Sequence, residues 1–417
     1  MHDPYLSLRF PNFRFFIATK LLITLYLQIE ALVVGWQLYE ITHDPLALGM
    51  IGLAVVIPAL SVSLLAGYVA DNFPRKRIVQ VCYLLYLLSI LVLISFSYFK
   101  NGFISQFGTL PMYIAVSING FARGFASPSS SSLMTDLVPK DAYFSSSSWN
   151  STAWELGSVF GPLIGGFSYA YFGATNTYIL AFFLVLAGLI FFSQINVPIV
   201  TVKQADREPI LKSVTEGLRF VFNSKMLLSA ITLDLFAVLF GGAVALLPVF
   251  AKDILHIDSV GLGMLRGATA VGAGLMALYL AYQPPMKQPG RNLLWAVAVF
   301  GISTICFAYS TNFYLSLACL FVLGAADSVS VIIRTTIMQM FVPAEMRGRV
   351  SSVNSMFISS SNELGAFESG VAAKFLGTVP SVVFGGFMTL LVVIGVKIFA
   401  PILLELDFQE KEKEKES

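Results

Sequence analysis

The segment Trp154-Glu155-Leu156-Gly157-Ser158-Val159-Phe160-Gly161-Pro162-Leu163-Ile164-Gly165-Gly166 determines how the rest of the chain is interpreted. It lies inside a long apolar run and holds four glycines and one proline within ten residues. In water these residues would break a helix. In lipid they are tolerated, because small residues let neighbouring backbones approach closely and because a bent helix can still satisfy its polar groups. The segment therefore predicts a membrane helix that packs tightly against its neighbours.

The composition of the whole chain also indicates a membrane protein. Hydrophobic residues make up 56% of its 417 residues and charged residues only 12%, which is far from the balance of a soluble domain. Residues 1–14 contain no small-residue cleavage site, so we expect the first apolar run to be a spanning helix and not a removed signal. Cys82, Cys306 and Cys319 lie in apolar runs without metal-ligand spacing, and we expect them to be small core residues.

The apolar runs predict an all-α membrane protein with twelve spanning helices, because each run has about the length that crosses a bilayer. The segment 196–225 between the sixth and seventh runs is polar, and Pro209–Phe222 within it has apolar residues on one helical face. We interpret it as an amphipathic linker on the cytoplasmic surface. The predicted helices cover approximately residues 15–36, 46–69, 78–99, 113–134, 150–171, 178–195, 226–251, 261–282, 293–309, 313–338, 350–376 and 382–404.

This pattern divides the chain into four predicted parts. An N-terminal six-helix bundle covers residues 1–195 and a C-terminal six-helix bundle covers residues 226–404, with the linker 196–225 between them. The last residues, 405–417, alternate Glu and Lys near the end and are expected to form a disordered cytoplasmic tail.

The two predicted bundles share an internal repeat. Residues 120–166 shifted by 204 positions coincide with residues 324–370 without a gap, which pairs Gly120 with Gly324 and Gly166 with Gly370. Leu48-Gly49-Met50 recurs as Leu262-Gly263-Met264 with a shift of 214. Chance similarity between apolar segments is the alternative, but the matched glycines, proline and asparagine keep their order. The repeat predicts two pseudo-symmetric halves related by an axis along the membrane normal.

Two motifs resemble signatures of the major facilitator superfamily. The spacing G-x-x-x-G-P-x-x-G-G in residues 157–166 resembles the fifth-helix signature of its antiporters. Gly67-Tyr68-Val69-Ala70-Asp71-Asn72-Phe73-Pro74-Arg75-Lys76-Arg77 resembles its loop signature, although Asn72 and Pro74 stand where the family usually has Arg and Gly. In the second half, residues 283–287 have no Ala-Asp pair, so the second copy of this loop is weak or lost.

The resemblance extends from Asn12 to the end of the last predicted helix. Further segments are similar to the twelve-helix bacterial branch that includes enterobactin exporters and related drug effluxers. The resemblance implies the major facilitator fold and a proton-coupled antiporter that exports small amphipathic molecules by alternating access. An importer or facilitator of a metabolite on the same fold and a non-transporting membrane receptor are the alternatives. The segments are Asp234-Leu235-Phe236, Leu247-Pro248-Val249-Phe250, 327–334, Arg347-Gly348-Arg349 and 362–370.

Ionisable residues deep in the predicted helices are costly in lipid, so each is a functional candidate. The resemblance implies that the first, fourth, seventh and tenth helices line a central cavity. The proton-coupling candidates on them are Asp234, Glu30 and Asp327. The candidates for the cavity and the substrate are Arg123, Arg334, Gln28 and Gln37.

Structural roles are the alternatives for these residues. Arg123 occupies the repeat position of Asp327, so the two charges are expected to face each other, but a fixed ion pair between Arg123 and Glu155 is the other possibility. Glu30 could instead cap a polar cluster with Gln28 and Gln37. Arg266 lies near the outer end of its helix and is expected to extend its side chain to the membrane surface.

The two motifs provide the candidates for conformational change. An acid at a helix end beside a basic turn can clamp neighbouring helix ends in one conformation and release them in another. Plain positive-inside topology would explain the bases of this turn but not the acid. The candidates are Gly67, Asp71, Arg75, Lys76, Gly157, Gly161, Pro162, Gly165 and Gly166.

The positive charges predict the orientation, because Lys and Arg concentrate on the predicted inner loops. Only Lys100, Lys252 and Lys374 fall on or near the outer loops, which predicts cytoplasmic termini in the cell (inner) membrane. The chain has no G-x-x-x-x-G-K-[ST] segment and no enzyme constellation, so we expect neither ATP-driven pumping nor an enzyme, and no cofactor or metal. The expected partners are a small-molecule substrate, protons and the lipid bilayer, without nucleic acid, and the expected state is a monomer.

Overall fold

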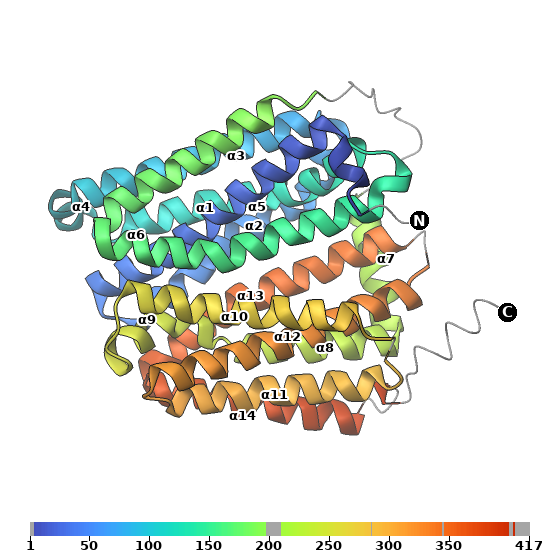
Figure 1. Ribbon diagram of the computed structural model, residues 1–417. Helices are drawn as coiled ribbons and strands as arrows, with labels where there is room; N and C mark the ends of the chain where they lie inside the picture. The colour runs from blue at the N-terminus through green and yellow to red at the C-terminus, as the bar shows by residue number, and fades with distance from the viewer. Residues whose placement is uncertain (1–3, 197–209, 285, 344–345, 400–402, 405–417) are drawn as a thin grey trace. The chain divides into compact units, whose positions relative to one another are not determined.

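The computed structural model describes residues 4–196, 210–284, 286–343, 346–399 and 403–404. Within these ranges the chain is built from helices joined by short turns, and they contain no strand (Figure 1). The predicted tail 405–417 and most of the predicted linker, residues 197–209, lie outside the described residues.

The helices of the first half agree with the predicted segments. Proline stands in the first turn of α1 and of α5, where its missing N–H costs nothing. The predicted fifth and sixth helices both lie within α6, and they meet at Gly173, whose positive φ of 78° is a backbone conformation that favours glycine. The elements are η1 Leu6–Arg9, α1 Pro11–Thr42, α2 Pro45–Asn72, α3 Arg75–Tyr98, α4 Lys100–Phe107, α5 Leu110–Asp136, η2 Lys140–Ala142 and α6 Tyr143–Ser193.

The second half begins with the linker helix and continues with six predicted segments that are also helical. The elements are α7 Ile210–Asn223, α8 Lys225–Phe240, η3 Ala243–Leu246, α9 Leu247–Val249, η4 Phe250–Ile254, α10 Ser259–Ala281, α11 Pro289–Tyr309, α12 Phe313–Phe341, α13 Arg347–Leu376 and α14 Thr378–Phe399.

The seventh predicted helix is not continuous, which corrects the expectation of one helix over 226–251. α8 ends at Phe240, and two glycines follow it before three short helical pieces that end at Ile254. Glycine is a poor helix former, and Pro248 lacks the N–H that an unbroken helix would use. The chain therefore breaks at Gly241–Gly242, just beyond the candidate residue Asp234.

Nine helical stretches of the described chain are long and apolar enough to cross a membrane. One of them, Lys140–Ser193, contains two of the predicted spans. α5 and α13, with 27 and 30 residues, are long enough but too polar to be among the nine. Every predicted span thus overlaps a helix, although the seventh is broken, while the count of twelve membrane crossings stays a prediction.

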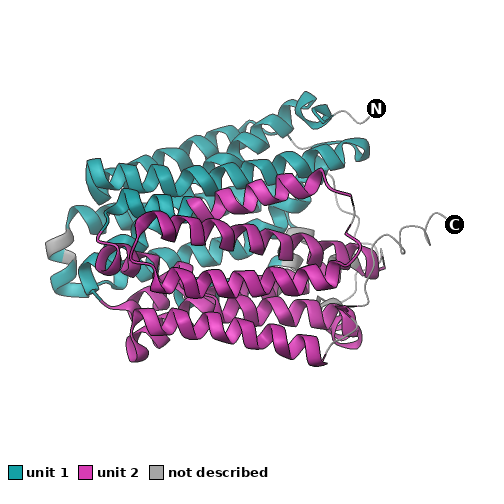
Figure 2. Ribbon diagram, turned by 60° about the horizontal axis from the view of Figure 1, so that its bottom comes forward, with its two compact units in different colours: residues 1–43, 53–210, 257–267 teal, residues 44–52, 211–256, 268–417 magenta. Residues whose placement is uncertain are grey.

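Contacts divide the chain into two units, each built mostly from one half of the sequence (Figure 2). Unit 1 contains residues 1–43, 53–210 and 257–267. Unit 2 contains residues 44–52, 211–256 and 268–417. The first residues of α10 therefore belong to unit 1 and the first residues of α2 to unit 2. The predicted boundaries at residues 195 and 226 differ from this division by these two short segments and stay predictions.

Each unit contains a glycine contact that supports the internal repeat. In unit 1, a Cβ added at Gly120 of α5 would lie 2.2 Å from the carbonyl oxygen of Val55 in α2. In unit 2, a Cβ added at Gly324 of α12 would lie 1.9 Å from the carbonyl oxygen of Thr269 in α10. The two glycines are paired by the repeat, so equivalent positions make the same backbone-to-backbone approach.

Residues 44–52 belong to unit 2 and residues 257–267 to unit 1, and we call them the exchanged segments. A second pair of repeat positions makes their contacts. In unit 1, a Cβ at Gly166 of α6 would lie 3.2 Å from the Cα of Gly263 in α10. In unit 2, a Cβ at Gly370 of α13 would lie 2.7 Å from the Cα of Gly49 in α2. The first turns of α2 and α10 therefore pack, through glycines, on helices from the other half of the sequence.

An aspartate lies at the start of each exchanged segment. Asp258 accepts a hydrogen bond from the Gly261 amide (3.1 Å) before α10, and Asp44 accepts one from the Leu46 amide (3.0 Å) before α2. Asp44 also pairs with Lys374 Nζ of α13 at 2.7 Å. Burial raises the pKa of Asp44, but the hydrogen bonds from Lys374 and Leu46 outweigh it and lower the pKa. Asp44 is therefore a carboxylate that fixes the start of α2 to α13.

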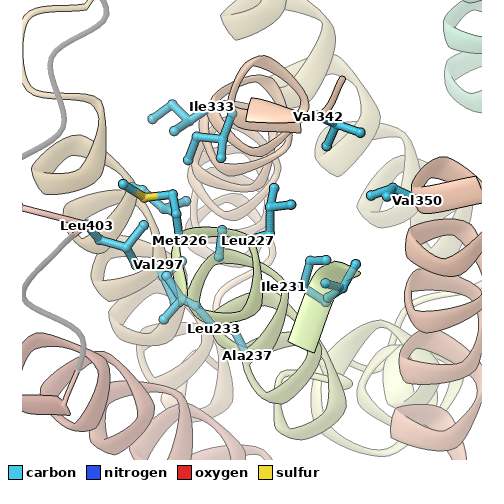
Figure 3. Packing of buried hydrophobic residues seen from close by; sticks show 14 of the residues in the cluster. Met226, Leu227, Ile231, Leu233, Ala237, Val297, Ile333, Val342, Val350 and Leu403 are labelled. Atoms are coloured by element: carbon cyan, nitrogen blue, oxygen red, sulfur yellow. The ribbon is translucent and has the colours of Figure 1, made fainter. Parts of the chain in front are cut away.

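A cluster of buried apolar side chains lies in unit 2 around α8 (Figure 3). Leu227 and Leu233 of α8 are fully buried there, together with side chains from α11, α12 and α13. The linker helix α7 joins this core through Val221, and its Glu216 forms an ion pair with Arg349 of α13. The apolar face of α7 thus packs on unit 2.

Gly324→Ala is expected to destabilise the protein by about 1–3 kcal/mol, because the added methyl group meets a backbone carbonyl that cannot rotate away. The matched control is Gly395→Ala in α14, where an added Cβ meets nothing within 4 Å. There the better helix propensity of alanine should leave stability unchanged or raise it by up to about 1 kcal/mol. Thermal unfolding of both variants at one scan rate in the same detergent measures the difference. Equal midpoints would show that α10 and α12 are not in close contact.

Candidate functional site

The candidate site of unit 2 is centred on a buried ion pair. Arg334 Nη1 of α12 pairs with Asp234 Oδ2 of α8, and the two side chains are only 8% and 7% exposed. Arg334 Nε also donates a hydrogen bond to Ser330 Oγ at 3.3 Å. A guanidinium group stays charged under all physiological conditions, so it needs this carboxylate when it is removed from water.

A second carboxyl group lies at the same site. Asp327 of α12 lines one small cavity together with Asp234 and Ser330, and Phe300 of α11 forms part of its apolar wall. Asp327 precedes Arg334 by seven residues and therefore lies on the same face of α12. Two carboxyl groups thus line one cavity inside spanning helices, and the guanidinium group of Arg334 pairs with one of them. The guanidinium balances one carboxylate, and a proton can balance the other.

Unit 1 holds a different buried carboxyl group, Glu30 of α1. Asn119 Nδ2 of α5 lies 2.5 Å from both carboxyl oxygens, and Ser89 Oγ of α3 lies 3.4 Å from Oε1. Tyr26 OH donates to the Asn119 carbonyl at 3.2 Å, which orients the amide. Glu30 is 3% exposed and forms no ion pair with any residue that the structure describes.

The two glutamines do not form the predicted polar cluster with Glu30. Gln28 Nε2 of α1 donates to Ser158 Oγ of α6 at 3.2 Å. Gln37 accepts from Tyr178 OH at 2.9 Å and donates to Ser97 Oγ at 3.3 Å. Gln37 is therefore fixed in a buried network within unit 1, whereas Gln28 lies beside the glycine segment of α6.

Arg123 is exposed on α5. Glu155 of α6 forms no ion pair in the described part of the chain, so the alternative of a fixed Arg123–Glu155 pair is not observed. A different cation approaches this helix: Lys20 Nζ of α1 lies 5.3 Å from the ring centroid of Trp154. Lys20 was not among the predicted site residues.

The fifth-helix signature lies between two helices of unit 1. Gly157, Gly161 and Gly165 face α1, where an added Cβ would lie 2.5–3.2 Å from Thr24, Gln28 and Ile29 respectively. Pro162 and Gly166 face the first turns of α10 instead, since the Pro162 carbonyl oxygen would lie 2.5 Å from a Cβ on Gly263. The segment thus lies between α1 of its own half and the start of α10 from the other half.

The basic turn of the loop signature ties three helix ends together. Arg75 Nη1 at the start of α3 pairs with Asp136 Oδ2 at the end of α5 at 2.7 Å. Lys76 Nζ donates to the carbonyl oxygens of Ser193 (3.0 Å) and Ile195 (2.6 Å) at the end of α6. Gly67 and Asp71 lie on α2, but their surroundings are outside the described structure.

Sequence reasoning missed three features of these sites. It found Asp234 and Arg334 separately but not their ion pair, and it did not mark Asn119 or Ser330 as partners. A usable signal existed for Asn119, because an amide in the middle of an apolar helix needs a hydrogen-bond partner. No such signal identifies Ser330, since serine is common in packed membrane helices.

Long apolar helices that bury ionisable groups, and that repeat their glycine contacts in two halves, are the architecture expected of a secondary transporter. A family model described as transmembrane secretion effector (MFS_3) matches residues 3–415. The chain therefore belongs to this family of the major facilitator superfamily, as its motifs predicted. Family membership makes it a membrane transport protein and not an enzyme.

Similar proteins include two curated exporters. The multidrug efflux pump Tap of Mycolicibacterium fortuitum is 25% identical over 394 residues, which cover 90% of this chain and 92% of that protein. The enterobactin exporter EntS of Shigella boydii serotype 4 is 25% identical over 402 residues, which cover 95% of this chain and 92% of that protein.

Solved structures confirm the fold. A POT family transporter superposes with a TM-score of 0.75 at 11% identity, covering 94% of this chain and 96% of that one. A D-xylose–proton symporter superposes with a TM-score of 0.72 at 13% identity, covering 95% of this chain and 99% of that one. The major facilitator fold is thus established for this chain.

Proposed function

We propose that the protein is a proton-coupled antiporter that exports small amphipathic molecules. The observation that carries the proposal is the cavity lined by Asp234 and Asp327 in unit 2, together with the ion pair between Asp234 and Arg334. Proton coupling needs a group that is alternately charged and neutral while the protein changes conformation. A second carboxyl group beside a single guanidinium group meets this requirement, because loss of one proton changes the site from neutral to negative and gain of one proton makes it neutral again.

The direction of transport follows from the relatives. This chain matches more than nine tenths of the length of two relatives. One is named as a multidrug efflux pump and the other as an enterobactin exporter. Export against a gradient needs an energy source, and an inward flow of protons supplies one. With cytoplasmic termini, as the positive charges predict, protons would enter the site from the outside and leave to the cytoplasm.

Alternating access has a structural basis in the exchanged segments. The first turns of α2 and of α10 contact α13 and α6 through Gly49–Gly370 and Gly263–Gly166. These contacts join helices from different halves of the sequence, whereas the Gly161 contact joins two helices of one half. We propose that the exchanged contacts open and close during transport, while the contacts within each half persist.

The test uses purified protein in liposomes with rhodamine 123 and an imposed pH gradient. An antiporter is expected to accumulate the dye on the side with more protons, and to lose the accumulation when a protonophore is added. Accumulation of the dye on the side with fewer protons would indicate an importer. Absence of both accumulation and counterflow would indicate a receptor and contradict the proposal.

Asp71→Asn is expected to slow dye exchange about tenfold while leaving dye affinity unchanged. The loop signature places this acid beside Arg75 and Lys76, which hold the ends of α5 and α6, and a loss of about 1.4 kcal/mol in one conformation corresponds to a tenfold change. The measurement is the counterflow rate at saturating rhodamine 123. Asp141→Asn, which removes an exposed carboxylate from the nearby loop, is the control. Unchanged turnover in Asp71→Asn would leave only positive-inside topology as the role of this motif.

A further inference from the structure

Arg266 of α10 is a partly buried cation that lies outside the site of Asp234, Asp327 and Arg334. Its Nε atom is buried and has no hydrogen-bond partner in the described part of the chain. It also forms no ion pair with a described residue. The residue as a whole is partly exposed.

The contacts of two neighbouring glycines show which part of α6 lies beside Arg266. A Cβ at Gly263 would lie 2.5 Å from the Pro162 carbonyl oxygen, and one at Gly267 would lie 3.7 Å from the Val159 carbonyl oxygen. Arg266 therefore lies level with Val159 of α6. Ser158, the adjacent residue, accepts the hydrogen bond from Gln28 of α1 at 3.2 Å. Polar groups of α1 and α6 thus lie level with the backbone of Arg266.

The chemistry of this position favours an anion. A guanidinium group keeps its charge and presents several N–H donors that match the two oxygens of a carboxylate or a sulfonate. A protein rarely keeps such a group desolvated without a counter-charge unless a ligand provides it. The described residues provide none at Arg266, although they provide Asp234 for Arg334.

We propose that Arg266 recognises an oxyanion of the transported molecule, so that the substrates include amphipathic anions. The proposal rests on the proposed transport function and adds the substrate class to it. The anionic group pairs with Arg266, while Gln28 and Ser158 offer hydrogen bonds to neighbouring polar groups of the same molecule.

The test compares two dyes with the same xanthene ring system and opposite charge, fluorescein and rhodamine 123. Arg266→Gln is expected to weaken fluorescein binding, measured by fluorescence anisotropy on purified protein, by about tenfold or more, since a charge-assisted contact is lost. Rhodamine 123 transport by Arg266→Gln should change less than about twofold. Arg266→Lys keeps the charge but not the planar set of donors, so its fluorescein affinity should lie between those of the wild type and Arg266→Gln. Arg219→Gln, which removes an exposed arginine of α7, is the matched control.

The outcomes separate this proposal from the transport function. Wild-type protein that transports rhodamine 123 but does not bind fluorescein would overturn the anion proposal and leave the exporter intact. Equal fluorescein binding by wild type and a folded Arg266→Gln variant would also overturn it. If rhodamine 123 is not transported, the exporter proposal fails, and fluorescein binding that depends on Arg266 would still support the anion site. Loss of fluorescein binding in Arg219→Gln as well would mean a nonspecific charge effect and reject the proposal.

Discussion

Asp234→Asn is expected to abolish accumulation of rhodamine 123 driven by a pH gradient. Asparagine has the size of aspartate but cannot take up or release a proton. Downhill counterflow needs no net proton movement, so it should persist in protein that remains folded. Both modes can be measured in one proteoliposome preparation, which separates loss of coupling from loss of transport.

The ion pair makes the single variant unsuitable as the only test. Removing Asp234 leaves Arg334 buried with its main counter-charge missing, at a cost of about 3–5 kcal/mol. The double variant Asp234→Asn/Arg334→Gln removes both charges and should recover most of this stability, measured by thermal unfolding. It should still fail to accumulate the dye. If the folded double variant concentrates rhodamine 123 against its gradient, Asp234 is not the coupling site, and Glu30 or Asp327 becomes the better candidate.

Gly161→Leu is expected to impair transport more than membrane insertion. A Cβ at this position would already lie 2.5 Å from the Cβ of Gln28, so a leucine side chain must separate α6 from α1. Such overpacking costs about 1–3 kcal/mol or more. It would also break the hydrogen bond between Gln28 and Ser158. Insertion depends on the apolarity of each helix, which leucine does not reduce.

The measurement compares the amount of protein in the membrane with the dye transport per molecule. Gly395→Leu in α14 is the control, because an added Cβ there meets nothing within 4 Å. Insertion of both variants at wild-type level, with transport lost only in Gly161→Leu, is the expected pattern. Normal transport by a well-folded Gly161→Leu variant would mean that the fifth-helix signature reflects only tolerance of small residues.

The helices and the repeat could be predicted because they depend on local properties. A run of about twenty apolar residues spans a bilayer wherever it occurs, and the glycines of equivalent helices kept their order. Gly120 therefore contacts Val55 in the first half, and Gly324 contacts Thr269 in the second half, as the repeat predicts. The membership in the major facilitator superfamily followed from motifs with fixed spacing in residues 67–77 and 157–166.

The partners of the charged residues could not be predicted because they depend on how each helix is rotated. Asp234 has no base near it in sequence, and only the packing of α8 on α12 brings Arg334 to it. Asn119 reaches Glu30 for the same reason, across 89 positions. The break after Phe240 was missed because its Gly241–Gly242 pair lies in a run whose apolarity is otherwise typical of a continuous helix.

The exchanged segments also set the order in which the protein can be assembled during synthesis. Gly166 and its hydrogen-bonded neighbour Ser259 are 93 positions apart. At a synthesis rate of about 5–20 residues per second, roughly 5–19 seconds pass before this partner exists. The start of α2 waits longer still, because Gly49 packs against Gly370 near the end of the chain. A nascent chain that stops after the linker would therefore carry two uncovered glycine faces, which exposes it to membrane proteases before either unit is complete.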